Sequence, residues 1–221
     1  MSVQTKSGKE VKAHTRYYNK AGQRVCGVTT FLGILNKPAL VPWANKLGLE
    51  GIEVRAYVDD KADIGKLAHR MTLDHLQKEE TDISIYTPKQ VELGKICFGK
   101  YLDWEKGHKI KPILLEAPLV SEKYQYGGTP DNYCLLDGVY ALLDYKTGKG
   151  IYEEMYYQLA AYVQLIVEAG HKVEKAKILR LGRDETEGFD ESPEIYDFSN
   201  HFKIFEHCME IYNLRKKIKA T

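Results

Sequence analysis

The segment most informative about the fold runs from Gly127 to Lys146 and reads Gly127-Gly-Thr-Pro-Asp131-Asn-Tyr-Cys-Leu-Leu-Asp-Gly-Val-Tyr-Ala-Leu-Leu-Asp144-Tyr-Lys146. Its apolar run from Val139 to Leu143 predicts a buried strand, and Asp137-Gly138 is a dipeptide favoured at the turn of a hairpin. Side chains alternate along a strand, so Asp144 and Lys146 should point one way and Tyr145 the other. Asp131 is then expected on the neighbouring antiparallel strand, near Asp144.

Two carboxylates beside a lysine indicate one kind of chemistry. Carboxylate oxygens bind hard divalent cations, and a lysine close to them can hold or activate a water molecule. The pattern Asp144-x-Lys146 is weak by itself, because Glu10-x-Lys12 and Asp59-x-Lys61 have the same spacing. Only the pair at Asp144 ends an apolar strand, where buried charges need partners. An ordinary salt bridge at a strand end is the alternative interpretation.

Further polar residues that could join this site lie on predicted helices. Gln158 and Tyr162 are four residues apart on a helix expected from about 152 to 169, so they share one face. Upstream, Gly65-Lys-Leu-Ala-His69 falls on a helix expected from 61 to 78. A lone helical histidine is more often structural than a ligand, whereas Gly65 would allow a close backbone approach one turn before His69.

These motifs, in this order, resemble the RecB-like branch of the PD-(D/E)XK nuclease superfamily. Those concerned are Gly65-x-x-x-His69, Asp131, Asp144-Tyr-Lys146 and Gln158-x-x-x-Tyr162. The segment from Gly27 to Trp43 also looks like the opening of small phage-type members. The resemblance covers roughly residues 24 to 170. It implies a restriction-endonuclease-like α/β/α core with a central mixed sheet and an amino-terminal helical region.

The resemblance also implies roles for these residues. His69, Asp131, Asp144 and the backbone carbonyl of Tyr145 would hold Mg²⁺ or Mn²⁺, and Lys146 would be the catalytic lysine. Gln158 and Tyr162 would orient Lys146 or a DNA phosphate. The second acid is Asp where many superfamily members have Glu, a variation common in the RecB-like branch.

Glu116 lies on a strand expected before the hairpin, in a region where family members often have a glutamate. It could hold a second metal ion or a water molecule. An edge-strand glutamate paired with a lysine is an equally weighted alternative. The number of metal ions therefore depends on where Glu116 lies.

The function expected from the resemblance is metal-dependent hydrolysis of DNA that leaves 3′-hydroxyl and 5′-phosphate ends. A metal ion would neutralise developing charge and lower the pKa of its bound water. An exonuclease of phage or bacterial DNA recombination, repair or processing is favoured, with single-stranded DNA or duplex ends as substrate. A structure-specific or restriction-like endonuclease is the first alternative. A DNA-binding module without cleavage is the second.

The 221 residues, 43% of them apolar, suit a single α/β domain. We expect a hairpin and helical cover over residues 1–110, a catalytic core over 111–182, and an acidic loop with a final helix over 183–221. No apolar run is long enough for a membrane span and no signal peptide is apparent, so a cytoplasmic location is expected, in the host if the chain is phage-encoded. Only Cys208 of the four cysteines follows the core. Some relatives carry an iron–sulfur cluster on one cysteine before the core and three after it, so no cluster is predicted.

Charge is distributed unevenly although the net charge is +1. Bases crowd both ends of the chain: Lys6, Lys9, Lys12, Arg16, Lys20 and Arg24 near the start, and Arg215, Lys216, Lys217 and Lys219 near the end. Either run could meet phosphates or be solvated. Residues 184–197 contain seven acids and no base, which predicts an exposed loop facing away from DNA.

The remaining elements follow from turn and cap signals. We expect a hairpin over 14–28, and helices over 30–36, 42–57, 61–78 and 200–217. Thr87-Pro88-Lys89-Gln90 predicts a capped helix start, with the helix running to about Lys106. Strands are expected over 110–120, 123–136, 139–146 and 172–181.

Overall fold

The computed structural model describes residues 3–4, 10–11 and 15–220. Its main sheet has the strand order β11-β10-β9-β8-β5. These strands are β5 (Ile110–Leu115), β8 (Asn132–Leu136), β9 (Val139–Lys146), β10 (Lys175–Leu181) and β11 (Phe189–Glu191). β9 and β10 run parallel and the other neighbours run antiparallel, so the sheet is mixed, as expected.

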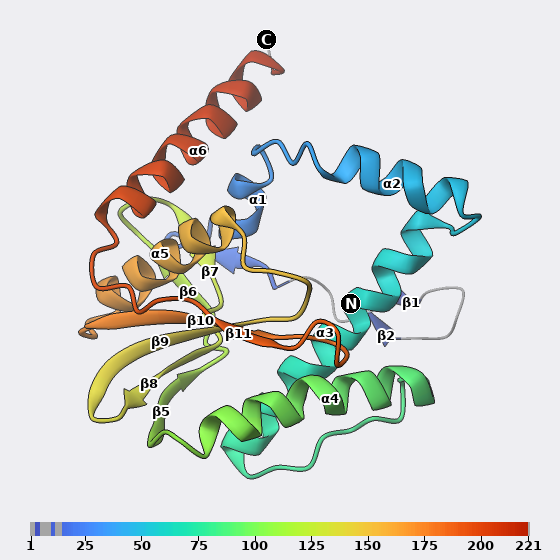
Figure 1. Cartoon of the computed structure of the whole chain (residues 1–221). Coiled ribbons are helices and arrows are strands. Elements are labelled where there is room, and N and C mark those ends of the chain that lie inside the picture. Colours follow the sequence, from blue (N-terminus) through green and yellow to red (C-terminus); the bar gives the residue numbers. More distant parts are fainter. Residues whose placement is uncertain (1–2, 5–9, 12–14, 221) are drawn as a thin grey trace.

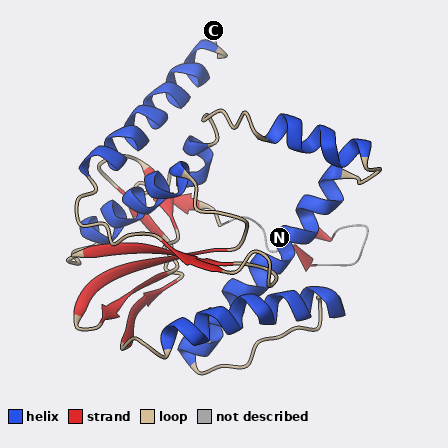
Figure 2. Cartoon of the chain, viewed as in Figure 1, coloured by secondary structure: helices blue, strands red, loops and turns tan. Residues whose placement is uncertain are grey.

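Helices cover both faces of this sheet (Figures 1 and 2). On one face lie α3 (Val54–Gln77) and α4 (Pro88–Glu105), and on the other α5 (Glu153–Glu168) and α6 (Ser199–Ile218). Alternation along β9 divides its side chains between two cores. Leu142 packs in the core formed with α5 and α6, whereas Leu143 and Tyr145 pack in the core that includes Ile64 of α3. The expected α/β/α arrangement is confirmed.

A smaller sheet stands beside the main one, with the order β3-β4-β7-β6. Its strands are β3 (Tyr17–Tyr18), β4 (Arg24–Gly27), β6 (Leu119–Ser121) and β7 (Tyr126–Gly128). The expectation of unbroken strands over 110–120 and 123–136 was therefore wrong. Glu116 has a left-handed φ of 41°, which ends β5, and Pro130 lacks the N–H that would continue a ladder between β7 and β8.

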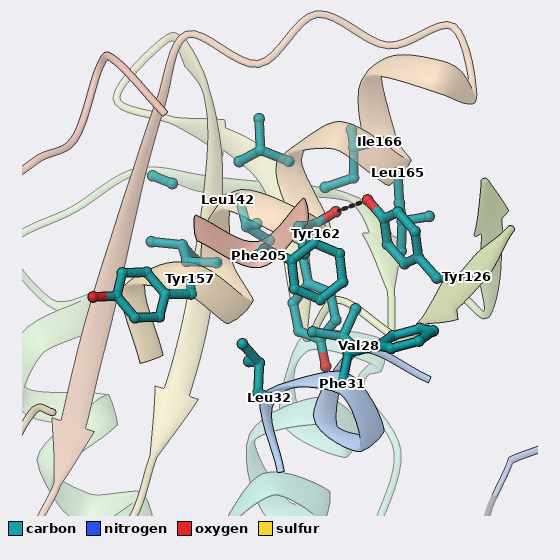
Figure 3. Close-up of a cluster of buried hydrophobic side chains, with 14 of the residues drawn as sticks. Val28, Phe31, Leu32, Tyr126, Leu142, Tyr157, Tyr162, Leu165, Ile166 and Phe205 are labelled. Carbon is teal, nitrogen blue, oxygen red and sulfur yellow. Dashed lines mark hydrogen bonds between the residues drawn. The ribbon is translucent and has the colours of Figure 1, made fainter. Parts of the chain in front are cut away.

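The hairpin expected over 14–28 is present as β3 and β4, although His14 lies outside the described residues. A short helix, α1 (Val28–Leu32), follows it and enters the core through Phe31, beside Tyr126 and Phe205 (Figure 3). The hydroxyl of Tyr126 donates to the Ala161 carbonyl of α5 at 2.8 Å. The small sheet is thereby joined to the core on the α5 face.

The helical region differs from expectation at one break. α2 (Leu40–Leu49) ends before Gly51, whose φ is 73°, and α3 already begins at Val54 instead of Lys61. The side chain of Glu53 caps α3 by accepting from the backbone N–H groups of Arg55 and Ala56. No single helix over 42–57 exists. The start of α4 at Thr87-Pro88 with its capping box is confirmed.

The acidic segment 184–197 is the expected exposed loop only in part. Three of its residues form β11, which pairs antiparallel with β10. Lys175 forms an ion pair with Glu194 at 2.7 Å, Lys177 pairs with Glu191 at 3.1 Å, and the Trp104 indole N–H donates to Glu191 at 2.9 Å. The acids are attracted to the bases of β10, so this segment completes the sheet. β1 (Val3–Gln4) and β2 (Glu10–Val11) pair with each other.

Candidate functional site

β9 delivers Asp144 and Lys146 to the face of the sheet that α5 covers. The Asp144 side chain is fully buried, and its Oδ2 lies 2.6 Å from the Nζ of Lys146. The Tyr145 side chain points to the opposite face, where it packs against Tyr101 of α4. The alternation expected from the sequence is confirmed.

Asp131 lies beside this pair at the start of β8. Asn132 is in register with Leu143, so Asp131 comes next to Asp144 across the antiparallel ladder. The carboxylate of Asp131 accepts from the backbone N–H of Tyr145 at 2.7 Å. This hydrogen bond fixes the Asp131 side chain to the strand that carries the other candidate residues.

His69 approaches from α3. Its Nδ1 lies 3.7 Å from Oδ1 of Asp131, and its ring meets the Tyr145 ring edge to face. Gly65, one turn earlier, allows this approach, because a Cβ there would lie 2.6 Å from Oγ1 of Thr147. The spacing from Gly65 to His69 thus has a packing reason: α3 crosses closely over the end of β9.

Gln158 and Tyr162 face the site from α5. The Gln158 side-chain amide donates to the Tyr162 hydroxyl at 2.8 Å. Burial raises the pKa of Tyr162, and the charge of Asp144 raises it further. A Cβ on Gly128 would lie 2.6 Å from Cε1 of Tyr162, so the second glycine of Gly127-Gly128 makes room for this ring.

Glu116 follows β5 and is tied to Asp131 through the backbone, because its N–H donates to the Asp131 carbonyl at 3.0 Å. Its charge acts on His69 in the direction of a higher pKa. Glu116 is therefore brought to the site. It does not lie within an edge strand, as the sequence pattern suggested.

Burial governs the protonation of these residues. It raises the pKa of Asp144 to about 6, against the opposing charge of Lys146, and it raises the pKa of Asp131. Burial lowers the pKa of His69, as does the Lys146 charge. For Lys146, burial works toward a lower pKa, but Asp144 and Asp131 outweigh it and the pKa is raised. His69 is thus kept neutral and Lys146 charged near neutral pH.

The donor set suits a hard divalent cation. Oδ1 of Asp144 is buried and has no hydrogen-bond partner, which is costly for a carboxylate unless something positive meets it. Asp131 and a neutral imidazole lie beside it, and oxygen and nitrogen donors of this kind bind Mg²⁺ or Mn²⁺. Within residues 15–220, however, no three His, Cys, Asp or Glu side chains already converge as a metal cluster. Binding would require small shifts of these side chains.

Asn132 is a residue that pattern reasoning missed. It is fully buried, and its side-chain amide donates to the Tyr145 hydroxyl at 2.9 Å. It thereby steadies the strand between Asp144 and Lys146 from the opposite face. Its position next to Asp131, as a polar residue opening an apolar strand, was the signal available.

A groove of about 1050 Å³ opens beside the site. Asp131, Glu116 and Tyr162 line it, together with residues of the small sheet, α1 and α6. Of the site residues proposed from sequence, His69, Asp144, Lys146 and Gln158 are not among the lining residues.

No protein-family model matches the sequence, and neither does any curated protein. Among solved structures, the alkaline exonuclease LHK-Exo from Laribacter hongkongensis is similar with a TM-score of 0.35 and 13% identity, over 72% of this chain and 91% of that one. A second, SSO0001, has a TM-score of 0.31 and 16% identity, over 69% of this chain and 74% of that one. At these TM-scores neither similarity carries an argument about this chain. Among the described helices, none is long and apolar enough to cross a membrane.

Proposed function

We propose that this protein is a metal-dependent deoxyribonuclease. The observation that carries the proposal is the buried Asp144 carboxylate, whose Oδ2 is paired with Lys146 and whose Oδ1 has no hydrogen-bond partner. Asp131 is its neighbour across the antiparallel ladder. Burying two carboxylates together costs stability, and groups perturbed in this way cluster at functional sites. Metal-assisted hydrolysis of a phosphodiester can use both a cation held by carboxylates and a lysine that stabilises developing negative charge.

Each residue has a distinct task in this proposal. Asp131, Asp144 and His69 hold Mg²⁺ or Mn²⁺, with the Tyr145 carbonyl as a further ligand. The bound cation supplies charge neutralisation at the scissile phosphate and a water of lowered pKa. Lys146, kept protonated by Asp144 and Asp131, orients that water or stabilises the negative phosphoryl oxygens. Gln158 and Tyr162, joined by their hydrogen bond, hold the substrate phosphate against Lys146.

An exonuclease is preferred over an endonuclease. α2 stands away from both sheets in Figure 1, joined to the rest by the segment after α1 and by α3. α3, which follows α2, brings His69 to the site. A helical cover over the site would admit a strand end and exclude a closed circle. The preference for DNA ends rests on this condition and on the motif resemblance to exonucleases.

The test is a gel assay with end-labelled linear single-stranded, linear duplex and closed circular DNA, in Mg²⁺, Mn²⁺ or EDTA. Linear DNA should shorten only with metal, and circles should survive. Lys146→Ala should lower the rate by about 100-fold or more, since a positioned charged group is lost. The matched control is Lys149→Ala, an exposed lysine just beyond β9, which should leave the rate unchanged.

Other outcomes point elsewhere. Cut circles would make the protein an endonuclease. DNA that is bound but intact under every condition would overturn the proposal in favour of a binding module on a nuclease fold. Cleavage by Lys146→Ala at the wild-type rate would show that another residue carries the chemistry.

A further inference from the structure

The groove beside Asp131 is lined by charged residues of both signs. Asp131 and Glu116 line it together with three bases, Arg16, Arg24 and Lys216. We call it the basic groove. Arg16 precedes β3, Arg24 opens β4 and Lys216 lies near the end of α6, so three distant segments of the chain supply its cations.

These three cations are exposed, and none forms an ion pair within the described part of the chain. The bases of β10 behave differently, because Lys175 and Lys177 are neutralised by acids of the segment around β11. Like charges converge on one groove only at a cost in repulsion, which an anionic ligand would relieve. The charges are thus available to a ligand.

Hydroxyl groups and a ring add to this lining. Thr29 and Thr30 are exposed at the groove, and Thr129 is hydrogen-bonded to the Tyr17 hydroxyl at 3.0 Å. Tyr17 lies directly over Gly127, where a Cβ would be 2.2 Å from its Cγ. Threonine hydroxyls, arginine and lysine are the groups that contact phosphate and sugar without reading bases.

We propose that the basic groove binds the backbone of one nucleic-acid strand next to the site, with Arg16, Arg24 and Lys216 on successive phosphates. Pockets of roughly 300–1,000 Å³ enclose ligands of small-molecule size. A short length of a single strand would fill a groove of about 1050 Å³. This inference rests on the proposed nuclease function and names the form of substrate that reaches Asp131. Because the contacts are to the nucleic-acid backbone, the affinity is independent of base sequence.

The test measures binding apart from cleavage. In the Lys146→Ala background, at fixed Mg²⁺, the affinity for a fluorescent single-stranded oligodeoxynucleotide is followed as KCl is varied. Loss of one phosphate contact should lower the slope of log affinity against log salt by about 0.7. We expect this for Arg24→Ala and for Lys216→Ala, equally for two oligonucleotides of different sequence. The matched control is Arg215→Ala, a neighbouring exposed base that does not line the groove.

A slope lowered equally by Arg215→Ala would overturn the proposal, because it would indicate diffuse attraction to the end of α6. Tighter binding of duplex than of single strand, or no binding at low salt, would also overturn it. The nuclease proposal fails separately. If the groove variants lower the salt slope but the wild type cleaves DNA in no metal, the groove proposal is supported and the nuclease proposal is contradicted. If the wild type cleaves DNA with metal but both groove variants leave the salt slope unchanged, the nuclease proposal is supported and the groove proposal is contradicted.

Discussion

At the scale of single residues, the central feature is a pair of carboxylates that the fold buries without fully satisfying. Asp144 is buried with one oxygen unpaired, and Asp131 is fixed by the Tyr145 N–H. Strand alternation was enough to predict that Asp144 and Lys146 share a face. It could not predict Asn132, because its hydrogen bond to Tyr145 depends on the register of β8 and β9.

Metal binding should appear as thermal stabilisation. A ligand that binds only the native state raises stability by about 2.7 kcal/mol at one hundred times its Kd, or several degrees in a protein of this size. Mn²⁺ should therefore raise the melting temperature of the wild type, and Asp144→Asn should lose most of the rise. Asp103→Asn, which changes an exposed acid of α4, is the control. An undiminished rise in Asp144→Asn would exclude this carboxylate as a ligand.

The same measurement should depend on pH. Burial raises the pKa of Asp144 to about 6, from an ordinary value of 3.8, so the native state binds this proton more tightly than the unfolded chain does. Without metal, the contribution of Asp144 to stability falls as pH rises between these two values. Metal competes with that proton. The Mn²⁺-induced rise should be larger well above pH 6 than well below it, and a rise independent of pH would contradict this assignment.

At the scale of elements, features set by local hydrogen bonds could be predicted from the sequence, whereas features set by tertiary packing could not. The capping box at Thr87 and Gln90 was predictable because its hydrogen bonds lie within one turn of the helix. The division of residues 110–136 between two sheets was not, although Pro130 and the left-handed Glu116 mark where it happens. The acidic strand β11 forms because β10 presents lysines to it, and composition alone does not reveal that partner.

The cap of α4 gives a prediction at this scale. Thr87→Ala removes the side-chain acceptor for the Gln90 N–H and should lower the free energy of unfolding by about 1 kcal/mol. Thr81→Ala, in the preceding segment, should change it little. Urea denaturation of the two variants and the wild type measures the difference. Equal values for both variants would mean that the capping hydrogen bond is replaced by water at no cost.

At the scale of the whole molecule, two cores lie on opposite faces of one sheet, and the end of α6 extends beyond them (Figure 1). Phe205, Cys208 and Met209 of α6 are buried, whereas Leu214 and Ile218 are half or more exposed. The first part of α6 therefore packs in the core. The exposed last turns of α6 contribute Lys216 to the basic groove.

Truncation separates the two parts of α6. A chain ending at Asn213 loses no buried side chain and should melt within a few degrees of the wild type. A chain ending at Phe198 loses all three buried residues and should not fold, because truncating each large core side chain costs about 2–5 kcal/mol. Circular dichroism on heating distinguishes them. If the chain ending at Asn213 is as unstable to heat as the chain ending at Phe198, the exposed last turns of α6 stabilise the fold.

Local periodicity and capping signals were enough to predict three features: the strand with Asp144 and Lys146 on one face, the shared face of Gln158 and Tyr162, and the capped start of α4. Which distant segments meet depends on the tertiary structure. Tyr17 reaches Thr129 across 112 positions, and Arg24 and Lys216 come to the groove of Asp131 from separate elements. The physical reason is that side-chain direction within an element follows from backbone geometry, whereas the meeting of elements follows from how their apolar faces pack.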